Sequence, residues 1–139
     1  MLAVNYINLL TKLYPELPKV YNLETAAYFY GATVANVSVA TFFYPKDCDF
    51  TPSNYLIGIE VDTLKDIPKR IVGSFYLTSP ERTLVDLYLY EELVDPQVTF
   101  DYISWFAVEF NEDPALYLPE QYRHGAREIV KEGWSHGNK

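Results

Sequence analysis

The hydrophobic pattern of this chain changes period twice, and that change limits the folds open to it. Apolar residues recur at helical spacing over residues 6–14 and again towards the C-terminus, whereas the middle of the chain alternates as strands do, for example at Val37 and Val39. Nine prolines and six glycines divide the 139 residues into short elements joined by frequent turns. Strands grouped between two helical blocks predict an α+β fold, with helices covering one face of a sheet.

Three segments have the β-branched and aromatic residues typical of strands, namely residues 34–44, 55–62 and 71–78. Two of the three connections in this part of the chain are short or of hairpin type, which favours antiparallel pairing. We therefore expect a small, mainly antiparallel sheet of three to four strands, flanked by N-terminal and C-terminal helices.

Capping residues indicate where the helices begin and end. Asn22 stands at an N-cap position before a short helix, and Gly31 stands at its C′ position. Thr78 and Glu81 have capping-box spacing, which predicts Thr78 as the N-cap of a helix that runs to about Leu93. In that helix, Arg82 and Asp86 are four residues apart and are expected to pair. Glu81, Arg82 and Asp86 are accordingly interpreted as structural.

Prolines restart the chain twice beyond that helix. Residues 100–110 predict an amphipathic helix after Pro96, and Pro119 opens a last helix that is expected to end at Gly133. The length suits one domain. We expect a single α+β domain over residues 1–134 and a frayed tail over residues 135–139.

Charge is distributed unevenly along the chain, whose formal net charge is −8. Residues 1–78 hold seven acids and six bases, whereas residues 79–139 hold twelve acids and five bases. Between Thr83 and Tyr122 there is no lysine or arginine, and aromatic residues are interleaved with the acids.

Two interpretations of this acidic stretch remain open. It is either a solvated face over an aromatic core or a docking surface for a basic partner. On a docking surface the acids would steer the encounter, and exposed aromatic side chains would supply binding energy. The acids lie at helix ends that adjacent helices could bring together. The candidate partner-binding residues are Glu91, Glu92, Asp95, Tyr102, Trp105, Glu109, Glu112 and Asp113.

Residues suited to catalysis or metal binding are few, so we expect neither an enzyme nor a cofactor. His124 and His136 lack the spacing of a metal site. The single cysteine, Cys48, cannot form an intrachain disulfide and lies between Asp47 and Asp49, a poor setting for a catalytic thiolate. These two aspartates are interpreted as a turn and not as a metal site. A small hydrolase or transferase remains the alternative from another class.

Direct binding to nucleic acid is also not expected, because the overall charge is acidic. The one coherent basic feature is the stripe Arg123, Arg127 and Lys131, which glutamates surround, so intrahelical salt bridges are the preferred interpretation. No apolar run approaches the ~18 residues of a membrane helix, and the N-terminus lacks the pattern of a secretory signal. The expected location is the cytoplasm. Thirteen tyrosines also permit a homodimer.

Two segments resemble a known family. Residues 22–31, from Asn22 to Gly31, resemble a helix of the AbiEi-type antitoxins of bacterial type IV toxin–antitoxin (abortive-infection) pairs. Residues 76–87, which include Pro80-Glu81-Arg82-Thr83-Leu84, resemble a second and more specific motif of the same family. The resemblance covers roughly residues 20–95, with strands between the two motifs.

The resemblance implies an antitoxin-like module whose partner is a nucleotidyltransferase-like toxin. Family members usually carry an N-terminal winged helix-turn-helix, and residues 1–21 are too few for that domain. We therefore expect only the C-terminal module, without autorepression. The alternative is an inhibitor encoded by a phage or mobile element, anti-CRISPR or anti-restriction, that occupies the basic nucleic-acid-binding surface of a host defence nuclease.

Overall fold

The computed structural model describes the backbone of residues 3–137 and the side chains of residues 4–132. It confirms the α+β class. The helices are α1 (Ala3–Leu13), α2 (Leu23–Phe29), α3 (Pro80–Leu89), α4 (Pro96–Phe110) and α5 (Glu120–Gly137), with short 3-10 helices η1 (Glu91–Leu93) and η2 (Pro114–Tyr117). The strands are β1 (Val20–Tyr21), β2 (Ala40–Pro45), β3 (Leu56–Val61), β4 (Lys69–Val72) and β5 (Phe75–Thr78).

The sheet has five strands in the order β3-β2-β1-β5-β4, not the three to four that we expected. It is also mixed and not mainly antiparallel: β1–β2 and β4–β5 are antiparallel, whereas β1–β5 and β2–β3 are parallel. The third expected strand is a hairpin, because the chain turns at Gly73 with a positive φ of 63°. The added central strand, β1, has only two residues, too few for an alternating pattern to reveal.

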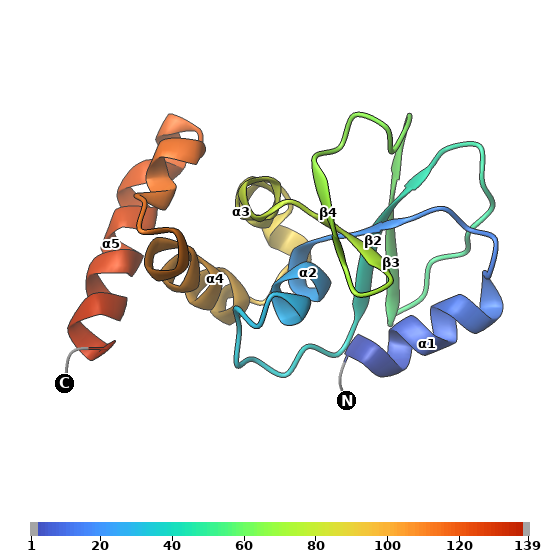
Figure 1. The fold of residues 1–139 in the computed structure, drawn as a ribbon, viewed down its shortest axis with the longest axis horizontal. Helices are drawn as coiled ribbons and strands as arrows, with labels where there is room; N and C mark the ends of the chain where they lie inside the picture. The colour runs from blue at the N-terminus through green and yellow to red at the C-terminus, as the bar shows by residue number, and fades with distance from the viewer. Residues whose placement is uncertain (1–2, 138–139) are drawn as a thin grey trace.

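Strand β2 presents alternate side chains to the two faces of the sheet. Phe42 joins Ile7 and Leu10 of α1 in one buried cluster, together with Leu77 of β5. Phe43 joins a second cluster on the other side, where it contacts the partly buried Tyr90. Helix α1 therefore covers one face of the sheet at one end of the molecule (Figure 1).

Helix α2 is fixed to β2 by buried threonines. The Thr25 hydroxyl accepts a hydrogen bond from the Thr41 backbone N–H at 2.8 Å, and the Thr41 hydroxyl donates to the Asn22 carbonyl at 2.7 Å. Asn22 occupies the predicted N-cap position, although its side chain makes no capping bond. Gly31 follows the helix with a φ of 70°, as the sequence predicts for a C′ glycine.

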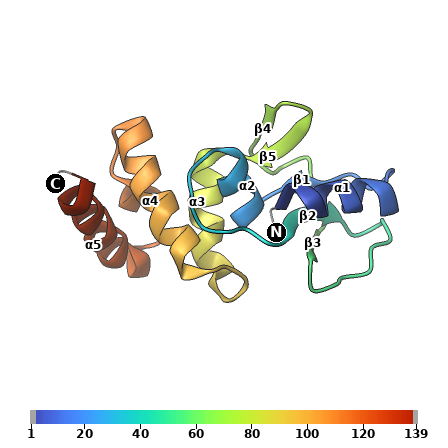
Figure 2. The ribbon, with the colours of Figure 1, turned by 90° about the horizontal axis from the view of Figure 1, so that it is seen from below.

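The C-terminal helices lie side by side, extending away from the sheet in the order α3, α4, α5 (Figures 1 and 2). They share a third buried cluster, which includes Leu84, Leu87, Ile103, Phe106 and Leu118. Helix α4 begins at Pro96, before the expected start at residue 100, because Asp95 caps it. Helix α5 continues to Gly137, past the expected end at Gly133. Residues 138–139 of the expected tail lie outside the described part of the chain.

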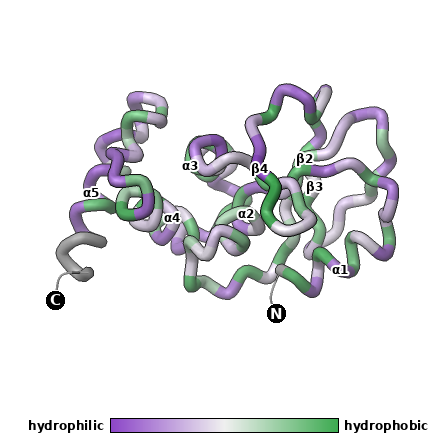
Figure 3. The backbone as a smooth tube through the Cα atoms, in the orientation of Figure 1, coloured by the Kyte–Doolittle hydropathy of each residue, from purple (hydrophilic) through white to green (hydrophobic). Residues whose placement is uncertain are grey.

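Hydrophilic residues predominate on α5, the outermost helix, where its residues are coloured (Figure 3). Within the part of the chain that the structure describes, no helix combines the length and the apolar composition needed to cross a membrane.

Candidate interaction surface

The first group of predicted contact residues lies where α3 passes into α4. Glu91 and Glu92 form most of η1, and both are exposed. Within residues 4–132, no hydrogen bond or ion pair holds either carboxylate. Asp95 is also exposed, but its carboxylate accepts the Gln97 N–H at 2.9 Å as the N-cap of α4. This end of α4 thus carries two free carboxylates and one that caps a helix.

The backbone beside Asp95 is tied to α2. Glu24, which is buried, accepts the Asp95 N–H through Oε1 at 2.7 Å. Burial raises the pKa of the Glu24 carboxyl, and the Asp95 N–H acts in the opposite direction. This contact fixes the start of α4, and with it the acidic end, against the rest of the fold.

The second group lies at the far end of α4, and two of its three members are engaged within the fold. Asp113 caps η2 by accepting the Ala115 N–H at 3.0 Å, and it pairs with Arg127 at 3.1 Å. Glu112 accepts a hydrogen bond from the Tyr117 hydroxyl. Glu109 is exposed and has no such partner among the described side chains.

The expectation that helix packing brings the two acidic groups together is wrong. Helix α4 separates them, and its 15 residues span about 22 Å at 1.5 Å per residue. That distance exceeds the screening length of about 8 Å at physiological salt, so the two groups act on a partner as separate patches.

Tyr102 is wrong as a contact residue, because its side chain is 0% exposed. Its hydroxyl donates to the Pro80 carbonyl at 2.8 Å, and burial raises its pKa well above the usual value. Trp105 is partly exposed and stacks on Tyr30, with ring centroids 5.8 Å apart. Tyr102 and Trp105 therefore serve mainly to join α4 to α3 and α2, and of these two residues only Trp105 stays a candidate contact.

A groove of about 470 Å³ opens beside the first acidic group, between α3, η1, α4 and α5. Leu87 and Val94 are buried in it, and Glu91 stands exposed at its edge. The lining residues are Leu87, Tyr88, Glu91, Val94, Pro96, Thr99, Phe100 and Ile129. Apart from Glu91, sequence reasoning missed these residues, because apolar residues at helical spacing indicate core packing as readily as a groove.

Tyr88 has an unusual environment in this groove. Its hydroxyl is buried and has no hydrogen-bond partner within the described side chains, while its ring packs on Tyr122 at 4.8 Å. Burial, followed by the negative charge of Glu91, raises the pKa of Tyr88 to about 12. The hydroxyl is neutral at physiological pH, so it is a buried hydrogen-bond donor without a described acceptor.

A second, smaller groove of about 330 Å³ lies on another side of α4, where Phe100 contributes to both. Asp101 there accepts hydrogen bonds from the Thr33 hydroxyl at 2.8 Å and the Val34 N–H at 3.2 Å. These bonds hold the loop after α2 against α4. The Asp101 carboxylate is thus used within the fold.

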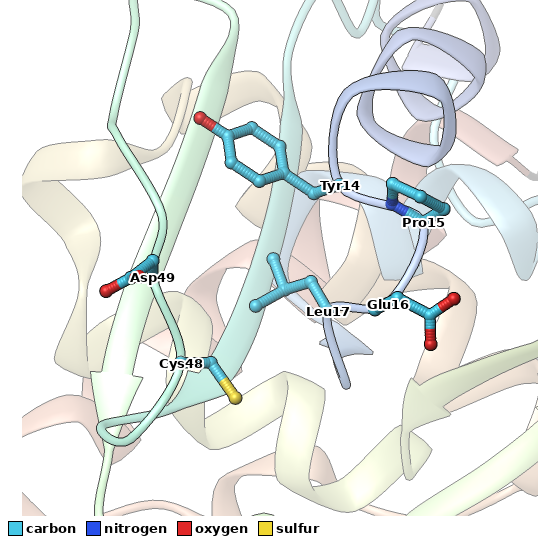
Figure 4. Close-up of a pocket in the computed structure, with 6 residues that line it drawn as sticks. All are labelled: Tyr14, Pro15, Glu16, Leu17, Cys48 and Asp49. Atoms are coloured by element: carbon cyan, nitrogen blue, oxygen red, sulfur yellow. The ribbon is translucent and has the colours of Figure 1, made fainter.

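Cys48 lines a third hollow, of about 300 Å³, between the end of α1 and the loop after β2. Figure 4 shows the thiol and Leu17 between the two segments, while the Glu16 and Asp49 carboxylates point to opposite sides. Neither of these two carboxylates is directed at the sulfur. In the described part of the chain, no three His, Cys, Asp or Glu side chains are grouped to hold a metal ion. His124 is exposed on α5, and the side chain of His136 lies outside the described residues.

The basic stripe on α5 does not form the expected intrahelical salt bridges in the described part of the chain. Arg127 pairs with Asp113 of the preceding loop, and Arg123 donates to the Leu118 carbonyl at 3.0 Å. The stripe therefore helps to dock α5 on η2.

The N-cap of α3 also differs from the expectation. Ser79, not Thr78, accepts the Arg82 N–H at 3.2 Å, while the Thr78 hydroxyl lies buried 2.6 Å from that of Thr83. The Arg82–Asp86 pair is confirmed.

No protein-family model matches this sequence, and no curated protein is significantly similar to it. The resemblance to AbiEi-type antitoxins thus rests on its two motifs.

Proposed function

We propose that this chain is an acidic, antitoxin-like protein-binding module that neutralises or inhibits a basic protein partner through its C-terminal helices. One observation carries the proposal. Between Thr83 and Tyr122 there is no base, and Glu91, Glu92 and Glu109 of that stretch are exposed without partners in the described part of the chain.

Exposed apolar side chains accompany these acids. Leu89 ends α3 and Leu93 ends η1, while Val108 (75% exposed) and Leu116 (65% exposed) lie near the far end of α4. Acids interspersed with exposed apolar groups suit a binding surface: the charges accelerate encounter and set orientation, and burial of the apolar groups supplies affinity.

Two buried carboxylates, Asp86 and Glu24, favour a binding role over catalysis, because both are already engaged. Asp86 is paired with Arg82 of the same helix, and Glu24 of α2 accepts the Asp95 N–H, so both carboxylates are used within the fold. The motif resemblance makes a nucleotidyltransferase-like toxin the first partner to test. A defence nuclease is the alternative, because it too would present a basic surface.

The test is capture of partners from a native host lysate with this chain as bait, at about 50 and about 500 mM salt, followed by mass spectrometry and titration with the purified partner. The matched bait has Glu91, Glu92 and Glu109 all replaced by lysine. We expect a basic partner that binds at low salt, dissociates at high salt and does not bind the triple variant.

Capture of a nucleotidyltransferase-like protein would support the antitoxin function. Capture of a CRISPR or restriction nuclease would support the alternative, an inhibitor of a defence nuclease. Equal binding of a purified partner to both baits would overturn the proposal, since the acids would then contribute nothing.

A further inference from the structure

The groove between α3, η1, α4 and α5 combines an apolar interior with a one-sided charge at its edge. Phe100 and Ile129, which are partly exposed, supply apolar surface over the buried Leu87 and Val94, within about 470 Å³, a volume in the range of ligand-binding pockets. Glu91 lines the groove, and Glu92 and Asp95 belong to the same turn between α3 and α4.

Among the described side chains of α5, the lysine and arginine residues do not offset this charge from the opposite wall, and Arg123 is engaged with the Leu118 carbonyl. Arg127 and Lys131 each lie two residues from Ile129, which places them about 200° around the helix from the side that lines the groove. Arg127 is in addition paired with Asp113. The acids at the groove edge are therefore left for a partner of opposite charge.

The secondary structure of the walls decides the kind of segment that fits. All four walls are helical, so most of their backbone N–H and C=O groups are used within helices, and no strand edge is offered. Recognition must then come from side chains entering the groove, as when an amphipathic helix lays its apolar face on a helical surface.

We propose that this groove is the docking site for a basic amphipathic helix of the partner, whose leucine or phenylalanine side chains enter between Phe100 and Ile129. Lysine or arginine residues flanking those anchors pair with Glu91 and Glu92. The inference rests on the proposed function and gives it a location and a partner chemistry. A second copy of this acidic chain fits less well, because it would bring like charges together.

The first experiment measures fluorescence anisotropy with a labelled peptide of about 15 residues, with leucine and phenylalanine on one helical face and lysine elsewhere. A scrambled peptide of the same composition controls for charge alone. We expect the amphipathic peptide to bind about tenfold more tightly than the scrambled one.

Three variants locate the binding. Thr99→Trp fills the groove, Glu91→Lys reverses the charge at its edge, and Glu109→Lys makes the same change in net charge at the far end of α4. We expect the first two to weaken the peptide about tenfold or more and the third less than about twofold. Equal effects of Glu91→Lys and Glu109→Lys, or equal binding of both peptides, would overturn the proposal that the groove is the docking site.

A second measurement does not depend on how the variants fold. In an NMR titration of the unaltered chain, the amphipathic peptide is expected to shift the signals of Tyr88, Thr99 and Ile129; shifts confined to other surfaces contradict the proposal. The two proposals fail separately. If a captured partner binds the Thr99→Trp variant normally, the groove is not its docking site, but the proposal of an acidic binding module stands. If the peptide binds in the groove but no charge-dependent partner is captured, the docking site stands and the proposed function is contradicted.

Discussion

Arg82 donates through Nε to both carboxylate oxygens of Asp86, at 2.9 and 3.1 Å, and the Asp86 side chain is fully buried by the packing around α3. The Arg82 guanidinium also lies 5.4 Å from the centre of the Phe43 ring, so the pair connects α3 with the sheet. Burial raises the pKa of Asp86 to about 6, and the hydrogen bonds and charge of Arg82 oppose that rise.

This pair predicts how stability changes with pH. Because the pKa of Asp86 is higher in the folded state than its ordinary value of 3.8, the folded state binds more protons between these values. The contribution of Asp86 to the free energy of unfolding is fully present below about pH 4 and is lost as pH rises through about 6. The loss is at most about 3 kcal/mol. Asp86→Asn removes this titration. Urea unfolding at several pH values is expected to show the variant gaining stability relative to the unaltered protein from pH 4 to 7; parallel profiles would contradict the account.

Replacing the cap of α3 tests the corrected assignment. Ser79→Ala leaves the Arg82 N–H without its acceptor and is expected to lower the free energy of unfolding by about 1 kcal/mol. Glu81→Gln, in the same turn, is the control. It removes only a charge near the helix N-terminus and is expected to lower the free energy of unfolding by about a few tenths of a kcal/mol, the size of a helix-dipole interaction. Thermal unfolding by circular dichroism measures both, and equal losses would contradict Ser79 as the dominant cap.

The contact between α2 and the start of α4 predicts a local effect. Glu24→Ala leaves the Asp95 N–H without its acceptor and is expected to destabilise the fold by about 1–3 kcal/mol. Glu24→Gln retains an acceptor oxygen and should cost less. Hydrogen exchange at the Asp95 amide is the direct measurement: it should accelerate in the alanine variant more than in the glutamine variant, and unchanged exchange would remove the contact from the account.

Two glycines provide a matched pair. A Cβ added at Gly58 would lie 2.8 Å from the Phe50 ring and 2.9 Å from that of Tyr44, so Gly58→Ala is expected to destabilise by about 1–3 kcal/mol. At Gly125, within α5, nothing lies within 4 Å, and Gly125→Ala should stabilise by up to about 1 kcal/mol. Denaturant unfolding distinguishes them; a neutral Gly58→Ala would show that the two rings move aside freely.

Sequence reasoning located the helices better than the sheet. Pro80, Pro96 and Gly31 mark helix ends, and they could be recognised because each acts within one turn of its own helix. Strand pairing had no such local signal. The connections suggested hairpins, yet β1 enters the centre of the sheet and pairs parallel with β5, more than fifty residues later in the chain.

The candidate contact residues divided along the same line. Glu91 and Glu92 are exposed as expected, since a charged side chain is rarely buried without a partner. Tyr102 was misplaced because an aromatic residue on an amphipathic helix suits either face, and only the packing of α4 on α3 buries it. Sequence alone also could not show that Asp113 is occupied by Arg127, fourteen residues away.

The sequence by itself determined the α+β class, most helix positions and the absence of bases between Thr83 and Tyr122. These properties depend on residue type, hydrophobic period and caps, which act over a few neighbouring residues. The tertiary structure alone decided the strand order, the separation of the two acidic groups along α4, and the groove that Leu87 of α3 and Ile129 of α5 line together. Such features arise from contacts between distant segments, whose free energy depends on which apolar surfaces are buried together.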